Sequence, residues 1–145
     1  MKPSKPYSIH ITHHFPVPAT VLFDAWLTAD IAKQWLFKTD TNTIIKVTIE
    51  PMKYGMFSVL SRNNDRTSIM FSGAYLEVDR PRHLLFTLRA SRGFSHVMYI
   101  AVAIEARGDG CEFTLTQTGD SPFVTEATWR MMFQHLHSVF NDSEH

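Results

Sequence analysis

The sequence predicts one α+β domain in which a curved antiparallel sheet of about six or seven strands wraps around a long C-terminal helix. Three observations predict this fold class. The chain has 145 residues, the usual size of a single domain. Apolar residues alternate with period two through most of residues 44–118, which is typical of strands. Between Val124 and Phe140 they recur at steps of three and four residues, which is typical of an amphipathic helix.

The N-terminal part of the chain predicts one strand followed by two short helices. Ser8–Phe15 alternates between its two faces and is therefore expected to be a strand. Pro18 suits the first turn of a helix, because the N–H that proline lacks has no partner there. Val21–Trp26 follows helical spacing, and Thr28 is the expected cap of a second short helix that carries Trp35.

Six further strands are predicted by alternation and by the polar turns between them. Their ranges are 44–49, 55–61, 67–78, 83–90, 94–106 (the longest) and 111–118. In the first of them Ile45, Val47 and Ile49 form the apolar stripe. Gly73, in the middle of a strand, predicts a bulge or a bend. Arg107–Gly110 is interpreted as a tight hairpin turn and not as an adhesion signal.

A final helix is predicted to begin at Pro122, with Asp120 or Ser121 as its cap, and to reach about residue 141. A helix of about twenty residues is roughly 30 Å long, which is enough to cross a whole sheet. One helix cannot fill the concave side of a strongly twisted sheet. We therefore expect a pocket between the two.

Composition and charge exclude several classes of function. Lys plus Arg and Asp plus Glu both number 14, and this balance gives no support to nucleic-acid binding. Cys111 is the only cysteine, so no internal disulfide is expected, which fits a reducing cytosol. No apolar run is long enough for a signal peptide or a membrane span. We expect a cytoplasmic protein with a disordered lead-in over residues 1–7 and a tail over residues 142–145.

Several segments resemble one known family. They are Phe15–Trp26 leading to Trp35, Ser72–Thr87, Cys111–Gln117, and the final helix at Trp129 and Leu136. Together they resemble the domain related to the activator of the Hsp90 ATPase, within the START and Bet v 1-like superfamily. The resemblance implies the helix-grip fold for a single domain over residues 8–141. The sequence departs from the family at Thr128, where a glycine is common, and in Leu36–Thr43, which lacks the usual loop glycines. The resemblance therefore implies no particular ligand.

The apolar side chains predict a pocket more strongly than any polar motif does. The chain has 11 Phe, 3 Trp and 7 Met, and methionine adapts well to irregular spaces. Each of these residues taken alone is more often plain core, but as a group they favour a cavity. His135 lies on the apolar stripe of the final helix, where a hydrogen-bonded core histidine is the commoner role. The candidate lining residues are Trp35, Phe57, Phe71, Tyr75, Phe86, His96, Met98, Phe113, Met132 and His135.

The sequence predicts no catalytic constellation, no metal site and no cofactor. His10 and His14 are four residues apart on a strand, about 13 Å, which is too far to share a zinc ion. His13 and His14 point to opposite faces of that strand, and His135 and His137 diverge on the final helix. Neither a Gly-x-Ser-x-Gly elbow nor a glycine-rich phosphate loop occurs.

Three functions follow from these observations. The first is a module that holds an apolar or amphipathic small molecule between the sheet and the final helix. The second, implied by the resemblance, is a co-chaperone-like interaction with an Hsp90 homologue. The third is a cyclase- or isomerase-type reaction carried by histidines in the pocket. The fold is also compatible with a homodimer, although no spare apolar stripe marks an interface.

Overall fold

The computed structural model describes residues 7–91, 97–119 and 124–142, which form seven strands and three helices. The elements follow the predicted order of one strand, two short helices, six strands and a final helix. They are β1 (Tyr7–Phe15), α1 (Ala19–Leu27), α2 (Ala29–Ala32), β2 (Asn42–Ile49), β3 (Met56–Asn63), β4 (Ser68–Asp79), β5 (His83–Ala90), β6 (Met98–Arg107), β7 (Gly110–Gly119) and α3 (Glu126–Asp142). β1 begins at Tyr7, one residue inside the predicted lead-in.

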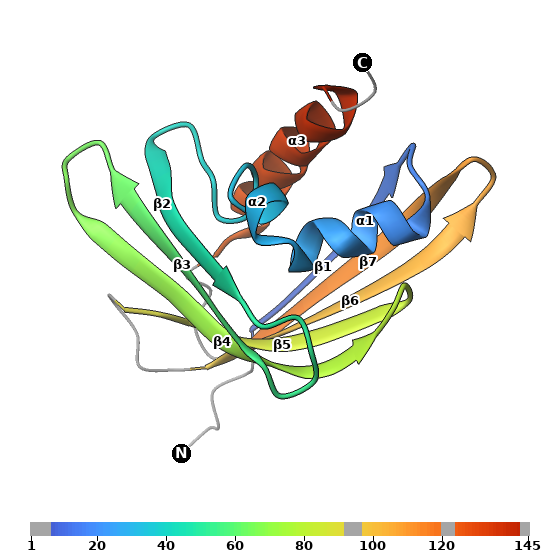
Figure 1. Ribbon diagram of the computed structural model, residues 1–145, viewed down its shortest axis with the longest axis horizontal. Coiled ribbons are helices and arrows are strands. Elements are labelled where there is room, and N and C mark those ends of the chain that lie inside the picture. The colour runs from blue at the N-terminus through green and yellow to red at the C-terminus, as the bar shows by residue number, and fades with distance from the viewer. Residues whose placement is uncertain (1–6, 92–96, 120–123, 143–145) are drawn as a thin grey trace.

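The strands form one antiparallel sheet in the order β1-β7-β6-β5-β4-β3-β2. Each strand from β2 to β6 pairs with the next one along the chain, while β1 pairs with β7 from Tyr7–Gly119 to Phe15–Cys111. The sheet is strongly curved, and all three helices lie on its concave side (Figure 1). The predicted fold class is therefore confirmed. No helix in the described ranges is long and apolar enough to cross a bilayer.

Three details of the strands differ from the prediction. Ile44, and not Ile45, is the buried apolar residue of β2, because the register shifts between Ile44 and Lys46 and Ile45 leaves the core stripe. Within the described residues β4 is longer than β6, which begins at Met98; the predicted start at Phe94 lies outside them. The bulge in β4 falls between Tyr75 and Glu77, just beyond the predicted glycine. The Arg-Gly-Asp segment is the predicted turn, with Gly108 at φ 58°.

The final helix begins at Glu126, four residues after the predicted start at Pro122. The Thr125 hydroxyl accepts a hydrogen bond from the N–H of Thr128 at 3.2 Å and caps the first turn. Just before it, the carbonyl of Val124 accepts a bond from the buried Gln117 amide at 2.7 Å. This bond holds the chain against β7 until the helix starts. The predicted caps, at positions 120 and 121, lie outside the described residues.

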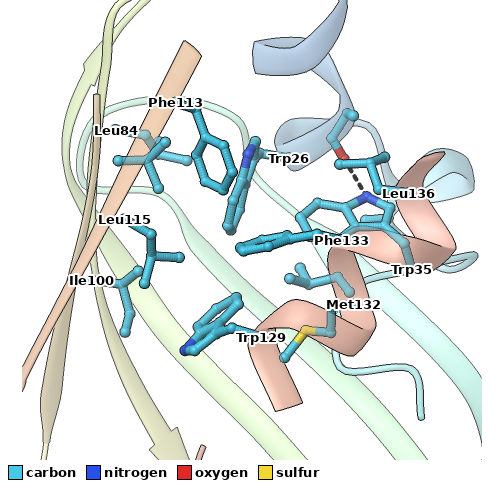
Figure 2. Packing of buried hydrophobic residues seen from close by; sticks show 14 of the residues in the cluster. Trp26, Trp35, Leu84, Ile100, Phe113, Leu115, Trp129, Met132, Phe133 and Leu136 are labelled. Carbon is cyan, nitrogen blue, oxygen red and sulfur yellow. Dashed lines mark hydrogen bonds between the residues drawn. The ribbon is translucent and has the colours of Figure 1, made fainter. Parts of the chain in front are cut away.

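The core fills the space between the sheet and the helices and is dominated by aromatic rings. Trp26 and Trp35 meet edge to face with ring centroids 4.7 Å apart, and the Trp35 indole donates to the carbonyl of Ala25 at 3.1 Å. Trp129 of α3 donates to Gln117 of β7 at 2.7 Å. Figure 2 shows the three tryptophans with Phe113 and Phe133 directed into one interior space. Helices and sheet are therefore joined by ring packing and by a few buried hydrogen bonds.

Candidate functional site

An interior cavity lies among α1, the connection from α2 to β2, and the strands β3, β4 and β5. The centre of a water molecule can range over about 10 Å³ of it, so it has room for one water. Its lining is almost wholly aromatic and aliphatic. The lining residues are Trp26, Leu36, Phe57, Tyr75, Leu84 and Phe86.

Strand register brings the aromatic lining together. Tyr75 of β4 and Phe86 of β5 are direct cross-strand partners, and Phe57 of β3 lies opposite Gly73. The ring centroid of Phe57 lies 5.5 Å from that of Tyr75 and 5.4 Å from that of Phe86. Gly73 has no side chain to fill this space, and an added Cβ would lie 2.8 Å from the Phe57 ring. The close backbone approach at Gly73 thus makes room for the cluster.

Few of the residues that line the cavity carry polar groups. Trp26 is 2 % exposed, and its indole N–H has no hydrogen-bond partner in the described part of the chain. Tyr75 is also buried, and this burial raises the pKa of its phenol well above the ordinary value. An indole nitrogen can only donate, so a group that completes this site must accept a hydrogen bond. Leaving such a donor unpaired costs about 1–3 kcal/mol.

Of the ten residues predicted to line a pocket, Phe57, Tyr75 and Phe86 lie at this cavity. Trp35 is buried behind it, where it packs on Trp26. Phe71 lies further along β4 and stacks on Phe37, with centroids 4.3 Å apart. These positions share one core, but they do not form a single lining.

The remaining predicted residues lie elsewhere. Met98 and Phe113 are fully buried in the core on β6 and β7, and the Met132 sulfur accepts the N–H of Phe37 at 3.0 Å. His135 differs from the predicted hydrogen-bonded core histidine, because its Nε2 has no hydrogen-bond partner in the described ranges. Asp40, the acidic group near it, is 3.8 Å away, beyond hydrogen-bond distance. His96 lies outside the described residues.

Three lining residues were not predicted. Trp26 follows the apolar spacing of α1, and Leu84 alternates within β5, so both carry an ordinary core signal in the sequence. Leu36 lies in an irregular connection, and its sequence position carries no periodic signal at all. Only the packing of α1 and this connection over β3–β5 identifies them.

A larger hollow of about 240 Å³ lies over β5, β6 and β7. It is open to solvent and is lined by outward-facing small residues such as Ala101, Ala103 and Thr114, with Glu77 and His83 also at its wall. The interior cavity, with its buried unpaired donor, has the stronger chemical signal for a ligand.

A second polar feature joins β1 to α3. The Nε2 atoms of His13 and His137 are 2.8 Å apart, and both rings are half-buried. Desolvation lowers the pKa of His13 below its ordinary value of 6.5, and His137, Arg130 and His14 lower it further. Desolvation also lowers the pKa of His137, with His14 contributing. Both imidazoles are therefore held mainly neutral in the folded protein at pH 7.

Because of the His13–His137 pair, the free energy of unfolding should decrease as the pH falls. The unfolded chain binds protons at these imidazoles near pH 6.5, whereas the folded chain resists them, so the unfolding free energy rises with pH in that window. We expect urea unfolding in metal-free buffer to show stability declining as the pH falls below about 6.5. His13→Gln should flatten the decline. Asp24, whose pKa is lowered by Arg80, acts only below its ordinary value of 3.8 and does not overlap. An unchanged slope in the variant would contradict this assignment.

The architecture defines the class of protein. A seven-stranded antiparallel sheet, two short helices after β1 and a C-terminal helix across the concave side form the helix-grip, Bet v 1-like fold. The chain belongs to the Activator of Hsp90 ATPase homolog 1-like family, whose model matches residues 16–142. This confirms the family predicted from the sequence segments.

Solved structures with the same fold are distant in sequence. A protein from Chromobacterium violaceum is 16% identical with a TM-score of 0.83, covering 91% of this chain and 95% of its own. One from Rhodobacter sphaeroides is 14% identical with a TM-score of 0.81, covering 95% of each chain. An Hsp90 activator from Plasmodium falciparum is 18% identical with a TM-score of 0.59, covering 76% of this chain and 71% of its own. A search of curated proteins finds no match.

Proposed function

We propose that this protein binds one apolar or amphipathic small molecule at the interior cavity, with an acceptor group of the ligand on the indole N–H of Trp26. The observation that carries the proposal is this buried donor, which has no partner among the described residues, in a mainly apolar lining. Ligand pockets characteristically combine apolar walls with a few polar groups that fix orientation. Tyr75 offers the second such group at the same wall.

Binding requires the cavity to enlarge, because typical small-molecule pockets measure roughly 300–1,000 Å³. The connection from α2 to β2 is the part proposed to move. It supplies Leu36 to the lining, and the next residue, Phe37, has φ 59°, a left-handed conformation that is costly for a bulky side chain. Phe37 is held there by its stack on Phe71 and by its N–H bond to Met132. Movement of this segment away from α3 would relieve the strain at Phe37 and would enlarge the cavity.

The first test is native mass spectrometry of the protein purified gently from its own host. We expect a discrete excess mass that disappears on denaturation. The Trp26→Phe variant, purified in the same way, should carry less ligand. Its affinity should be about 3–10-fold lower than that of the native protein, because one hydrogen bond contributes about 0.5–1.5 kcal/mol. Its loss of stability should be smaller than that of Trp35→Phe, because the removal of a buried unpaired donor offsets part of the lost ring packing.

Trp35→Phe is the matched control. Trp35 touches Trp26, but its N–H is already bonded to Ala25, so this variant should lose stability and keep the ligand. Equal ligand loss in both variants would contradict the role of the Trp26 donor. A clean apo mass in the native protein would contradict the proposal as a whole and direct attention to a protein partner. Recovery of the host's Hsp90 homologue on the immobilised chain would then support the co-chaperone-like alternative.

A further inference from the structure

The charge of the cavity and its surroundings restricts which ligand the Trp26 donor can take, an inference that rests on the proposed function. The six described residues that line the cavity include no acidic or basic side chain. The polar groups there are the Trp26 indole N–H, which can only donate, and the Tyr75 hydroxyl, which can donate or accept. Burial raises the pKa of this phenol well above its ordinary value, so the hydroxyl stays neutral. The site therefore offers donors without positive charge.

The lysine and arginine side chains on the surrounding elements are engaged elsewhere or exposed. The Lys38 ammonium donates to the carbonyls of Thr39 and Asn42, at 2.5 and 2.7 Å. Arg80 forms a bidentate ion pair with Asp24 of α1, in which both hydrogen bonds measure 2.8 Å and both side chains are largely exposed. The other described cations of the connection and of β3, β4 and β5 are exposed, namely Lys33, Arg62 and Arg89. A negative charge in the cavity would therefore lack a partner among the described residues.

The other two buried tryptophans show which acceptor this core provides for an indole. Trp35 donates to the peptide carbonyl of Ala25 at 3.1 Å, and Trp129 donates to the side-chain amide oxygen of Gln117 at 2.7 Å. In Figure 2 a dashed line joins the Trp35 nitrogen to its acceptor, and none reaches Trp26. Both paired indoles thus use an uncharged carbonyl oxygen, and the third lacks one.

The cost of burying an ion decides between a charged and a neutral acceptor at Trp26. Moving a carboxylate out of water costs several kcal/mol unless an opposite charge accompanies it. One hydrogen bond contributes only about 0.5–1.5 kcal/mol, which does not offset that cost. A neutral carbonyl loses far less hydration and still satisfies the donor. We infer that the ligand is an uncharged molecule with a carbonyl or similar neutral acceptor, and that carboxylates such as fatty acids bind much more weakly.

The test compares three probes that share one ring system, at pH 7.5. They are 1-indanone, indane and indane-1-carboxylate, each titrated into the full chain labelled with nitrogen-15. The Trp26 indole N–H resonance is identified by its absence from the spectrum of Trp26→Phe. We expect 1-indanone to move this proton resonance further downfield than indane does, because indane has the ring but no acceptor. Indane-1-carboxylate should bind at least about tenfold more weakly than 1-indanone.

Two variants separate the donor from the packing of its ring. Trp26→Phe should lower the ratio of the 1-indanone affinity to the indane affinity by about 3–10-fold, the effect of one hydrogen bond. Trp35→Phe should leave this ratio unchanged, because the N–H that it removes is already bonded to Ala25. General loosening of the core affects both ligands and cancels in the ratio, so a purely structural role of Trp26 would not change it.

The outcomes distinguish this inference from the proposed function. Equal or tighter binding of indane-1-carboxylate would overturn the inference and leave the proposed function standing. An unchanged affinity ratio in Trp26→Phe would overturn the assignment of the acceptor to this donor. Binding of none of the three probes would also overturn the inference. A discrete excess mass in the native protein would then preserve the proposed function, whereas a clean apo mass would contradict both.

Discussion

Trp129→Ala is expected to destabilise the protein by about 4–5 kcal/mol. Removing a buried tryptophan ring typically costs about 3–5 kcal/mol through lost burial and the cavity left behind. Trp129 is fully buried and lies 6.0 Å from Trp26 and 6.1 Å from Phe133, ring centre to ring centre. The substitution also leaves the Gln117 side-chain oxygen without its partner at 2.7 Å, in a wholly buried position. Urea unfolding monitored by far-ultraviolet circular dichroism measures the loss.

Trp129→Phe separates the two contributions. The phenyl ring keeps much of the packing but cannot donate to Gln117, so about 1–3 kcal/mol should be lost. The Gln117 amide keeps its bond to the Val124 carbonyl in this variant, so the start of α3 should stay in place. A loss below about 1 kcal/mol for Trp129→Ala would mean that α3 is not anchored to β7 as described.

Gly73→Ala is expected to cost about 3 kcal/mol or more, a large effect for a single added methyl group. The new Cβ would overlap the carbonyl oxygen of Thr87 and would lie 2.8 Å from the Phe57 ring. Overpacking a core usually costs about 1–3 kcal/mol, and here the obstacle is backbone, which cannot rotate away. β4 and β5 must separate locally, where Ala74 donates to the Thr87 hydroxyl at 2.9 Å. Chemical denaturation measures the change.

Gly108→Asn is the matched control for this prediction. Gly108 has φ 58°, but a Cβ there would meet nothing within 4 Å, and asparagine tolerates this left-handed conformation. Its cost should therefore stay below about 1 kcal/mol. Equal losses in the two variants would show that backbone entropy, and not the contact with Thr87, governs Gly73.

The sequence predicted the elements well wherever a periodic pattern was the physical cause of the structure. Alternation identified all seven strands, and the prolines and hairpin turn marked several of their ends. The periodic pattern failed where particular hydrogen bonds decide the local structure. The bulge beyond Tyr75 and the shift at Ile44 depend on cross-strand pairing, and α3 starts after Thr125, whose hydroxyl caps its first turn.

The candidate site was only partly predictable for the same reason. Phe57, Tyr75 and Phe86 alternate toward the core, so a periodic argument finds them. Leu36 follows no period, and nothing in the sequence distinguishes the unpaired N–H of Trp26 from the bonded N–H of Trp35. That difference depends on whether an acceptor happens to lie within reach in the packed core.

Composition and periodicity by themselves determined the α+β class, the order of elements and the apolar character of the interior. Burial of apolar surface is a property of residue type and spacing, and both can be read along the chain. Tertiary structure alone decided which polar atoms lack partners and which distant side chains converge. His13 and His137 meet at 2.8 Å only because β1 pairs with β7 and α3 crosses beside them. Chemistry of that kind depends on distance in space, and sequence separation carries no information about it.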